Sequence, residues 1–180
     1  YGYQWRNFNK AYDEDDNGTL EELDQVKSIV NTLHKNPMDR RMVCSAWNPS
    51  QISRMALPPC HILWNVVVIG DTINLGWYQR SCDLMLGVPF NVASYGLLLL
   101  LLAKESGLKP AKLSGTLGDC HIYENHFEEA RLQLTRTPKT LPNLLVSSDE
   151  SWLGIFNWKA TDVILTGYEP YPPIKMAVAV

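Results

Sequence analysis

The apolar positions between residues 20 and 35 follow helical spacing, and Asn36-Pro37 ends the pattern. Spacings of three and four residues place apolar side chains on one face of a helix, and proline cannot continue it. The pattern therefore predicts an amphipathic helix over residues 20–35. Its apolar face consists of Leu20, Leu23, Val26, Ile29, Val30 and Leu33.

The middle of the chain has the pattern of strands and then of a long apolar helix. Residues 42–47 and 61–69 are rich in β-branched and aromatic residues, and Gly70-Asp71 then predicts a hairpin turn into the sequence TINLGWYQR. A helix is expected over about 91–105, followed by a short extended segment through Leu117. A second helix is expected over 125–136, and short strands between proline- and glycine-rich turns complete the chain.

This order of elements favours the α+β class. We expect a single domain over residues 1–180, with a mixed β-sheet and a long buried helix across one face. The sequence GLLLLLLA from Gly96 to Ala103 predicts that this helix is buried on all sides. The run is far shorter than the roughly 20 apolar residues that a bilayer requires, so no membrane association is expected.

Composition and charge narrow the function classes. The net charge is −3 and the isoelectric point is near 5.8, so the chain lacks the basic field of a nucleic-acid binder. Four cysteines are scattered without a CxxC pair, which favours free thiols in a reducing, cytoplasmic setting over a disulfide framework or a metal site. They are Cys44, Cys60, Cys82 and Cys120.

The acidic sequence DEDDNGTLEELD, from Asp13 to Asp24, resembles a calcium-binding EF-hand loop. Asp24 stands where such a loop has a longer, bidentate glutamate, and no second loop is present in this sequence. The interpretation that we favour is a solvated acidic loop whose last residues cap the following helix.

Cys60 has the most unusual setting of the four cysteines, because it follows Pro58-Pro59 and directly precedes the strand 61–69. Prolines fix the backbone and remove two donors. A cysteine acts as a nucleophile in its thiolate form, which nearby cations favour. Arg80 and the pair Arg40-Arg41 are the candidate cations. Cys44, inside a strand, is expected to be an inert buried thiol.

Several polar side chains could bind a nucleotide. Arg40 and Arg41 could form a phosphate fork, although a solvated pair is the commoner reading. Arg80 and Ser81 could also hold a phosphate, and Asn91 offers both a donor and an acceptor to the edge of a base. On an extended segment, His121 and Tyr123 would point to the same face.

Six segments, in this order, resemble the thymidylate synthase family. They are YGYQWR, DRRMVCSAWNP, MALPPCH, YQRSCDLMLGVPFNVASY, GDCHIYENH and GYEPYPPIKMAVAV. The resemblance runs from Tyr1 to Val180 and corresponds to about the C-terminal two-thirds of a typical member. We therefore expect an N-terminal part outside this sequence, which would carry the family's remaining phosphate arginine, catalytic glutamate and folate-stacking tryptophans.

The resemblance implies that the chain converts dUMP to dTMP with 5,10-methylenetetrahydrofolate as co-substrate and without a metal. Cys60 would add to the uracil ring, and Tyr1, His61 and Arg80 would be the other catalytic residues. The implied substrate-binding residues are Arg40, Arg41, Gln79, Arg80, Ser81, Asn91, His121 and Tyr123. Folate would contact Asp83, Leu86, Gly87, Phe90 and Ala179.

The resemblance also implies a homodimer, in which Arg40 and Arg41 reach the phosphate in the partner subunit's site. One departure is Asn65, where the family usually has glutamine. Two alternatives remain open. One is a pyrimidine hydroxymethylase on the same fold, in which water instead of hydride captures the methylene group. The other is a non-catalytic nucleotide-binding relative.

Overall fold

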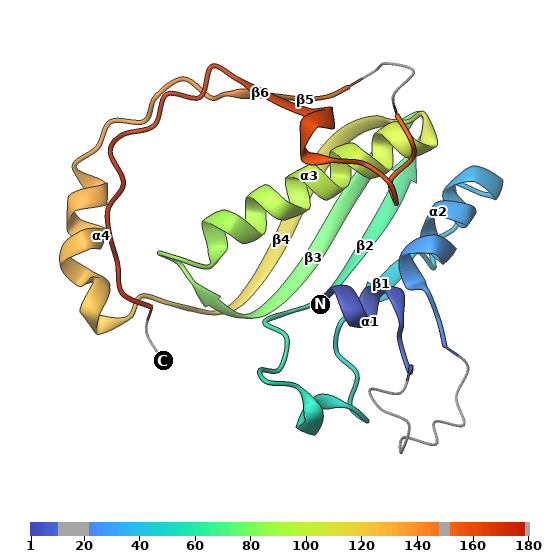
Figure 1. The fold of residues 1–180 in the computed structure, drawn as a ribbon, viewed down its shortest axis with the longest axis horizontal. Coiled ribbons are helices and arrows are strands. Elements are labelled where there is room, and N and C mark those ends of the chain that lie inside the picture. Colours follow the sequence, from blue (N-terminus) through green and yellow to red (C-terminus); the bar gives the residue numbers. More distant parts are fainter. Residues whose placement is uncertain (11–21, 148–151, 179–180) are drawn as a thin grey trace.

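The structure, a computed structural model, describes residues 1–10, 22–147 and 152–178. Its centre is a four-stranded sheet in the order β1-β2-β3-β4 with one long helix, α3, across it (Figure 1). The strands are β1 (Val43–Ser45), β2 (His61–Ile69), β3 (Thr72–Asp83) and β4 (Lys109–His121), and α3 spans Val88–Ser106. The α+β class with a mixed sheet is thus confirmed.

Strands β2 and β3 form the predicted hairpin around Gly70-Asp71. Their side chains alternate as the two-residue period of a strand requires. Trp64, Val66 and Val68 of β2 are buried, and they pair in register with Trp77, Leu75 and Ile73 of β3. Val67 and Ile69 point to the other face and are exposed. The hairpin therefore supplies the centre of the core and leaves an apolar outer face.

Strand β4 returns parallel to β3 after the α3 crossover, whereas the β1–β2 and β2–β3 pairs are antiparallel. A parallel pair needs such a crossover because the chain must return to the same end of the sheet. Helix α3 begins with Pro89 in its first turn and ends at Gly107, whose φ of 68° is left-handed. The crossover brings residues 79–83 of β3 beside residues 117–121 of β4.

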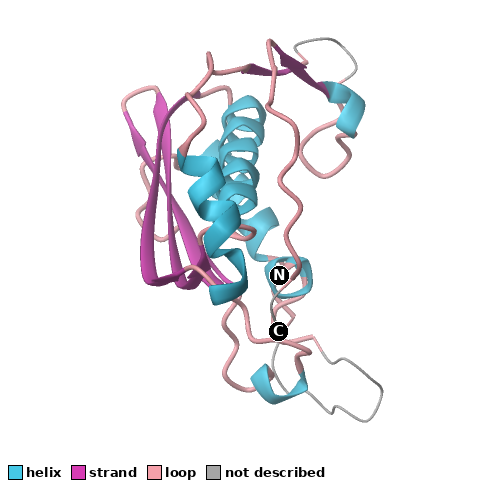
Figure 2. Ribbon diagram, turned by 90° about the vertical axis from the view of Figure 1, so that its left-hand side faces the viewer, coloured by secondary structure: helices cyan, strands magenta, loops and turns pink. Residues whose placement is uncertain are grey.

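Helices α1 (Gly2–Arg6) and α2 (Gln25–Lys35) lie on the same side of the sheet as α3 (Figure 2). Helix α2 buries Val26, Ile29, Val30 and Leu33, the predicted apolar face from residue 26 onward. Asp24 caps it by accepting a hydrogen bond of 2.9 Å from the backbone N–H of Lys27. The predicted capping role is confirmed, although the helix begins five residues later than residue 20. Residues 11–21, which hold most of the calcium-loop pattern, lie outside the described residues.

The C-terminal part forms a smaller layer. Helix α4 (Phe127–Leu134) follows the short 3₁₀ turn η2 (Glu124–His126), and β5 (Asn143–Val146) pairs with β6 (Val163–Thr166) in a two-stranded antiparallel sheet. The 3₁₀ turns η1 (Ile52–Arg54) and η3 (Ala160–Asp162) lie in loops. The chain after β6 runs back alongside α4 (Figure 1). This return brings the C-terminal residues to the end of β4 at which His121 lies.

Two expectations about α3 and β4 were wrong in extent. The segment after α3 is not short, because β4 continues for 13 residues to His121. Within the described part of the chain, helix α3 is not buried on all sides. Leu99, Leu101 and Leu102 are buried, but Phe90 and Val92 are exposed. By length and composition α3 could also cross a membrane, yet here it packs on the sheet as a core helix does.

Gly115 allows β4 to pack against β3. A Cβ atom at this position would lie 2.4 Å from the Trp77 ring. We predict that Gly115→Ala lowers the free energy of unfolding by about 1–3 kcal/mol, because the ring or the strand must shift. Urea denaturation measures the change.

Gly96→Ala in α3 is the matched control, since a Cβ there would meet only Leu113 Cδ2, at 4.0 Å. Alanine at a helical position should leave stability equal or raise it by about 1 kcal/mol. Equal midpoints for Gly115→Ala and the parent protein would contradict the prediction.

Candidate active site

Cys60 lies one residue before β2, at the edge of the sheet, as its sequence setting predicted. The Cys60 residue itself is half-buried. The backbone fixes it on both sides. The N–H of Cys60 donates to the Tyr1 hydroxyl at 2.7 Å, and the carbonyl of Cys60 accepts from the N–H of Arg80 at 2.8 Å. The nucleophile candidate is therefore held by two separate segments of the chain.

The Arg80 side chain hydrogen-bonds to the loop that precedes Cys60. Its Nε donates to the Pro59 carbonyl at 2.9 Å, and one terminal nitrogen donates to the Pro58 carbonyl at 2.8 Å. The guanidinium also lies 5.7 Å from the centre of the Trp47 ring. These bonds explain the two prolines physically, since their carbonyls accept while their fixed backbone angles keep both acceptors in place. Guanidinium carries five N–H groups, so others remain for an anion.

Three aromatic rings lie beside Cys60: Tyr1 stacks on His61, and Tyr95 meets His61 edge to face with ring centroids 5.3 Å apart. We call these three residues the aromatic stack. The rings of Tyr1 and His61 are parallel, with centroids 3.7 Å apart. His61 Nδ1 and the Tyr95 hydroxyl share a hydrogen bond of 2.7 Å. The stack thus connects α1, the start of β2 and the middle of α3.

A β-bulge sets the direction of His61. The register of β2 and β3 shifts between His61 and Leu63, so that His61 pairs with Gln79 and Leu63 pairs with Tyr78. Strict alternation would give His61 the same outward face as Leu63. The extra residue turns His61 toward Tyr95 on α3 instead, a use of bulges that is common beside functional sites.

The stack is electrically neutral at neutral pH. Burial lowers the pKa of His61 to about 4, and burial raises the pKa of Tyr1 and of Tyr95 above the ordinary tyrosine value. Each group therefore offers a neutral donor or acceptor next to Cys60. Such a set can position a water molecule and transfer a proton without creating a buried charge.

Gln79 and Asn91 form an amide pair at the junction of β3 and α3. Gln79, which is buried, donates from Nε2 to Asn91 Oδ1 at 2.9 Å and to the Ser81 carbonyl at 3.1 Å. The first bond identifies the oxygen of Asn91 and orients its amide. Asn91 Nδ2 then points away from Gln79 as a donor.

Residues 83–90, from the end of β3 through the turn into α3, include four of the five residues predicted to contact folate. Asp83 Oδ1 accepts from the backbone N–H groups of Met85 and Leu86, at 3.0 and 3.3 Å. Gly87 is needed for close packing, because a Cβ there would lie 3.1 Å from the Asp83 carbonyl. Phe90 is 72% exposed, an unusual state for a phenylalanine. Ala179 lies outside the described residues.

His121 and Tyr123 lie together at the end of β4. Their rings meet edge to face with centroids 5.0 Å apart, and Asp83 is the in-register partner of His121. The neighbouring His126 is fully buried, and its Nε2 shares a hydrogen bond of 2.6 Å with the Ala177 carbonyl. The C-terminal segment is thus tied close to His121 and Tyr123.

Arg40 and Arg41 are not brought to Cys60 within one chain. Val43 pairs with Asn65, and the Met42 carbonyl accepts from Val66, so Arg41 lies beyond the middle of β2. The rise of a strand puts this point roughly 20 Å from His61. Arg41 forms a bidentate ion pair with Asp39, which lowers the pKa of that carboxyl to about 2.

These contacts place most of the predicted residues around residues 79–83 of β3. A model of the family described as thymidylate synthase matches residues 1–180, the whole chain. The chain belongs to this family. The family is one of methyltransferases of dTMP biosynthesis that use a folate co-substrate, and the sequence resemblance is confirmed at this level.

The roles of four residues of the site were missed by sequence reasoning. Tyr95 and His126 lie in helical segments and carry no local signal, since only their partners His61 and Ala177 give them a role. The carbonyls of Pro58 and Pro59 were read as rigid backbone and not as acceptors. The phrase VASY within the family motif was the available hint for Tyr95.

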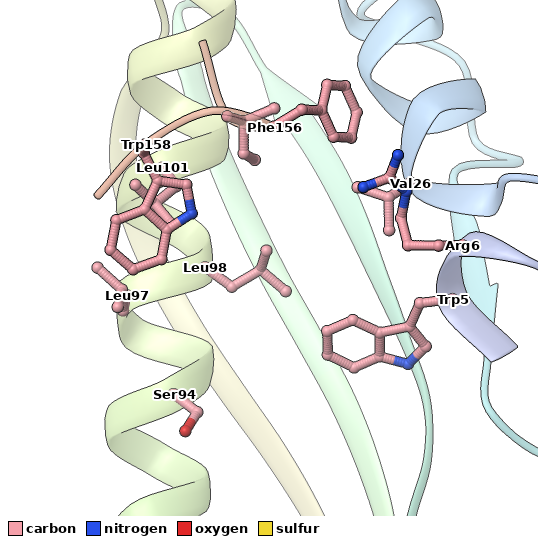
Figure 3. Close-up of a pocket in the computed structure, with 10 residues that line it drawn as sticks. Trp5, Arg6, Val26, Ser94, Leu97, Leu98, Leu101, Phe156 and Trp158 are labelled. Carbon is pink, nitrogen blue, oxygen red and sulfur yellow. The ribbon is translucent and has the colours of Figure 1, made fainter. Parts of the chain in front are cut away.

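An apolar pocket of about 300 Å³ lies between α1, α3 and the segment after β5 (Figure 3). Tryptophan, phenylalanine and leucine side chains make up most of its wall, and Arg6 lies over the Phe156 ring at 4.4 Å. None of its ten lining residues is a cysteine, histidine or carboxylate. It therefore offers an apolar surface and no reactive group.

Within the described residues no cluster of histidine, cysteine and carboxylate side chains could hold a metal ion. Most of the predicted calcium loop is outside that part of the chain. Calcium binding therefore stays a hypothesis, beside the solvated acidic loop that the sequence favours.

The low pKa of His61 gives a prediction about stability and pH. Because its pKa falls from about 6.5 when unfolded to about 4 when folded, the unfolded chain binds more protons between these values. The contribution of His61 is complete above about pH 6.5 and is lost progressively as the pH falls toward 4. We predict that His61→Asn reduces the loss of unfolding free energy between about pH 7 and about pH 5.

Urea denaturation at both pH values measures this difference. Asn31→Ser in α2 is the control, because Asn31 is exposed and the change removes no titratable group, so the pH dependence should stay as in the parent protein. Equal pH dependence in His61→Asn and the parent would contradict the prediction.

Proposed function

We propose that this chain carries out the reductive methylation of dUMP to dTMP, with 5,10-methylenetetrahydrofolate as co-substrate and Cys60 as nucleophile. The observation that carries the proposal is the position of Cys60. It is clamped through Pro58, Pro59 and its own backbone to Arg80, on the strand that also bears Gln79 and Ser81. A thiol, an anion-binding guanidinium and an amide pair are the groups that a pyrimidine nucleotide requires.

Cys60 would act by covalent catalysis. Its sulfur forms a bond to carbon 6 of the uracil ring, which breaks the conjugation and makes carbon 5 nucleophilic. After carbon 5 gains the one-carbon unit, it loses its proton, and the carbon–sulfur bond breaks to release Cys60. The neutral aromatic stack beside Cys60 would relay protons during these steps, as its hydrogen bonds support.

Asn91 would select uracil. Its oxygen accepts from Gln79 and can accept a second hydrogen bond from N3–H of the ring. Its Nδ2 would donate to the 4-oxygen. Cytosine presents an amino group at that position, which cannot accept. Gln79 thus acts as the positioning residue for this selectivity.

The remaining nucleotide groups would be bound from the two adjacent strands. Arg80 and Ser81 would hold the phosphate, and Arg80 would also favour the thiolate of Cys60. His121 and Tyr123 would bind the ribose hydroxyl. The register of β3 and β4 supports this division, because Asp83 is paired with His121 only two residues beyond Ser81.

The turn between β3 and α3 fits a folate. Phe90 exposes an aromatic ring in the first turn of α3, and Asp83 ends β3, with Leu86 and Gly87 between them in the sequence. A flat, hydrogen-bonding pterin suits an apolar ring beside an acceptor. When bound, the folate supplies the one-carbon unit and the hydride. The chain's own residues would orient it, and the C-terminal residues, held close by His126, would cover it.

A homodimer is part of the proposal. Arg40 and Arg41 are remote from Cys60 of their own chain, and the Arg41 side chain is 88% exposed, so both would serve the phosphate of the partner's site. The outer face of the sheet supports a subunit contact there, since Val43, Val67 and Ile69 expose apolar surface on adjoining strands. We further propose that the protein works in the cytoplasm.

The first test is covalent trapping. With 5-fluoro-dUMP and methylenetetrahydrofolate, the fluorine cannot leave as a proton does, so the reaction should stop with both ligands attached to Cys60. Mass spectrometry of the intact protein detects the adduct. We expect full loss of it in Cys60→Ala and retention in Cys44→Ala, since Cys44 is fully buried and burial raises its pKa to about 12.

The absence of an adduct at saturating ligand would refute Cys60 as nucleophile and favour the non-catalytic relative. Dihydrofolate formation, followed by absorbance, then separates the synthase from a hydroxymethylase. Hydride transfer produces dihydrofolate, whereas capture by water leaves tetrahydrofolate.

The amide pair gives a prediction about specificity. Asn91→Asp replaces the donor Nδ2 with an acceptor oxygen, so kcat/KM for dUMP should fall by about 100-fold or more while activity toward dCMP rises. Ser94→Asp in the same helix is a charge-matched control and should leave the dUMP/dCMP ratio unchanged, because Ser94 lines the apolar pocket. An unchanged ratio in Asn91→Asp would contradict the assigned role.

A further inference from the structure

Cys82 and Cys120 face each other across β3 and β4, within the candidate site but outside the proposed reaction. They are in-register partners of the parallel pair. Cys82 stands between Ser81 and Asp83, and Cys120 directly precedes His121. The two thiols therefore lie where the proposed phosphate and ribose residues meet.

The geometry of the pair suits a disulfide. In-register residues on adjacent strands share a face, and the strands are about 4.8 Å apart. Disulfides join Cα atoms that are about 4.4–6.8 Å apart. Burial is the larger cause of the raised pKa of the Cys82 thiol, and Cys120 also lies close enough to raise it. The Cys82 thiol donates in addition to the Gln79 carbonyl, at 3.5 Å.

The two cysteines differ in exposure, which gives them different roles. Cys120 is exposed, whereas Cys82 is fully buried, and its pKa is raised first by burial and then by Cys120. An oxidant from solution reaches Cys120. Cys82 is shielded from the oxidant, and its in-register position keeps it next to the oxidised sulfur of Cys120.

We propose that Cys82 and Cys120 form a reversible disulfide through which hydroperoxides control nucleotide binding at this site. The Cys120 sulfur attacks the O–O bond of hydrogen peroxide and becomes a sulfenic acid, and one water leaves. The Cys82 sulfur then attacks the sulfenic sulfur, the S–S bond forms, and a second water carries away the remaining proton and oxygen. A dithiol reductant reverses the reaction.

Closing the bond changes the contacts of Cys82. In a disulfide the Cys82 sulfur carries no proton, so its hydrogen bond to the Gln79 carbonyl is lost, and the Cβ–S–S–Cβ dihedral must adopt an angle of about 90°. Ser81 and His121, one residue from each cysteine, shift as the backbone adjusts to this geometry. A displacement of about 1 Å in positioned groups is enough to change binding or rate by up to roughly a hundredfold. In a reducing cytoplasm the pair stays open until oxidants accumulate.

Peptide mapping tests the disulfide itself. Trypsin places the four cysteines on four peptides, 42–54, 55–80, 81–104 and 113–131. The purified Cys60→Ala protein, in which the nucleophile cannot react, is treated with hydrogen peroxide, alkylated and digested without reductant. We expect peptides 81–104 and 113–131 to be joined with the loss of two hydrogens, and to separate with dithiothreitol.

Matched variants sharpen the mapping. Cys120→Ser in the same background should abolish the link, and Cys44→Ser should leave it intact. The proposal is overturned if peroxide takes Cys120 to sulfinic acid without a link, or if Cys120 links to Cys120 of another copy. A Cys60–Cys82 link as the main product of the parent protein would overturn it equally.

Calorimetry with dUMP tests the consequence, which rests on the proposed function. The affinity of the Cys60→Ala protein should fall about tenfold or more on oxidation and recover with dithiothreitol, whereas the protein that also carries Cys120→Ser should not respond. Unchanged affinity despite a mapped disulfide overturns the control. If the reduced protein does not bind dUMP, the proposed function fails, and the mapping still decides the disulfide.

Discussion

The organisation of the site depends on the hydrogen bonds between Arg80 and the loop before Cys60. Its side chain holds the carbonyls of Pro58 and Pro59, and its backbone N–H holds the carbonyl of Cys60. A guanidinium bonded twice in a fixed geometry is more restrictive than a single hydrogen bond. Arg80 belongs to β3, one of the two central strands of the sheet. The sheet, and not the loop alone, therefore determines the position of the Cys60 thiol.

The rest of the site follows from the same strand. Gln79 points inward and orients Asn91. Ser81 and Asp83 follow on the same strand, and β4 places His121 next to Asp83. Residues from both faces of β3 therefore contribute to the site at the end of this strand. Opposite it, the neutral rings of Tyr1, His61 and Tyr95 surround Cys60 without adding charge. Arg80 adds a positive charge beside Cys60, and Asp83 places a carboxylate at the end of β3.

Sequence reasoning predicted the elements with strong local signals. Strand β2 has the expected bounds, and the Gly70-Asp71 turn and the apolar face of α2 follow directly from spacing. The bulge at His61 and the parallel return of β4 could not be predicted, because each depends on pairing between distant residues and not on composition. The full burial expected of α3 was wrong because a run of leucines does not show how many neighbours will cover it. Tyr95 gained its role from the turned His61, so missing the bulge also meant missing the tyrosine.

The link between Tyr1 and Cys60 has a consequence for the order in which the molecule assembles. Those two residues are 59 positions apart, whereas β2 and β3 are joined by a two-residue turn. Loop closure costs more entropy as the intervening chain lengthens, and local contacts form sooner. We therefore expect the β2–β3 hairpin and the hydrogen bonds of Arg80 to the loop before Cys60 to form early in folding. The Tyr1 segment should pack against Cys60 later. By the same asymmetry, we expect the Tyr1 segment to open on the native sheet more readily than the hairpin does, without global unfolding.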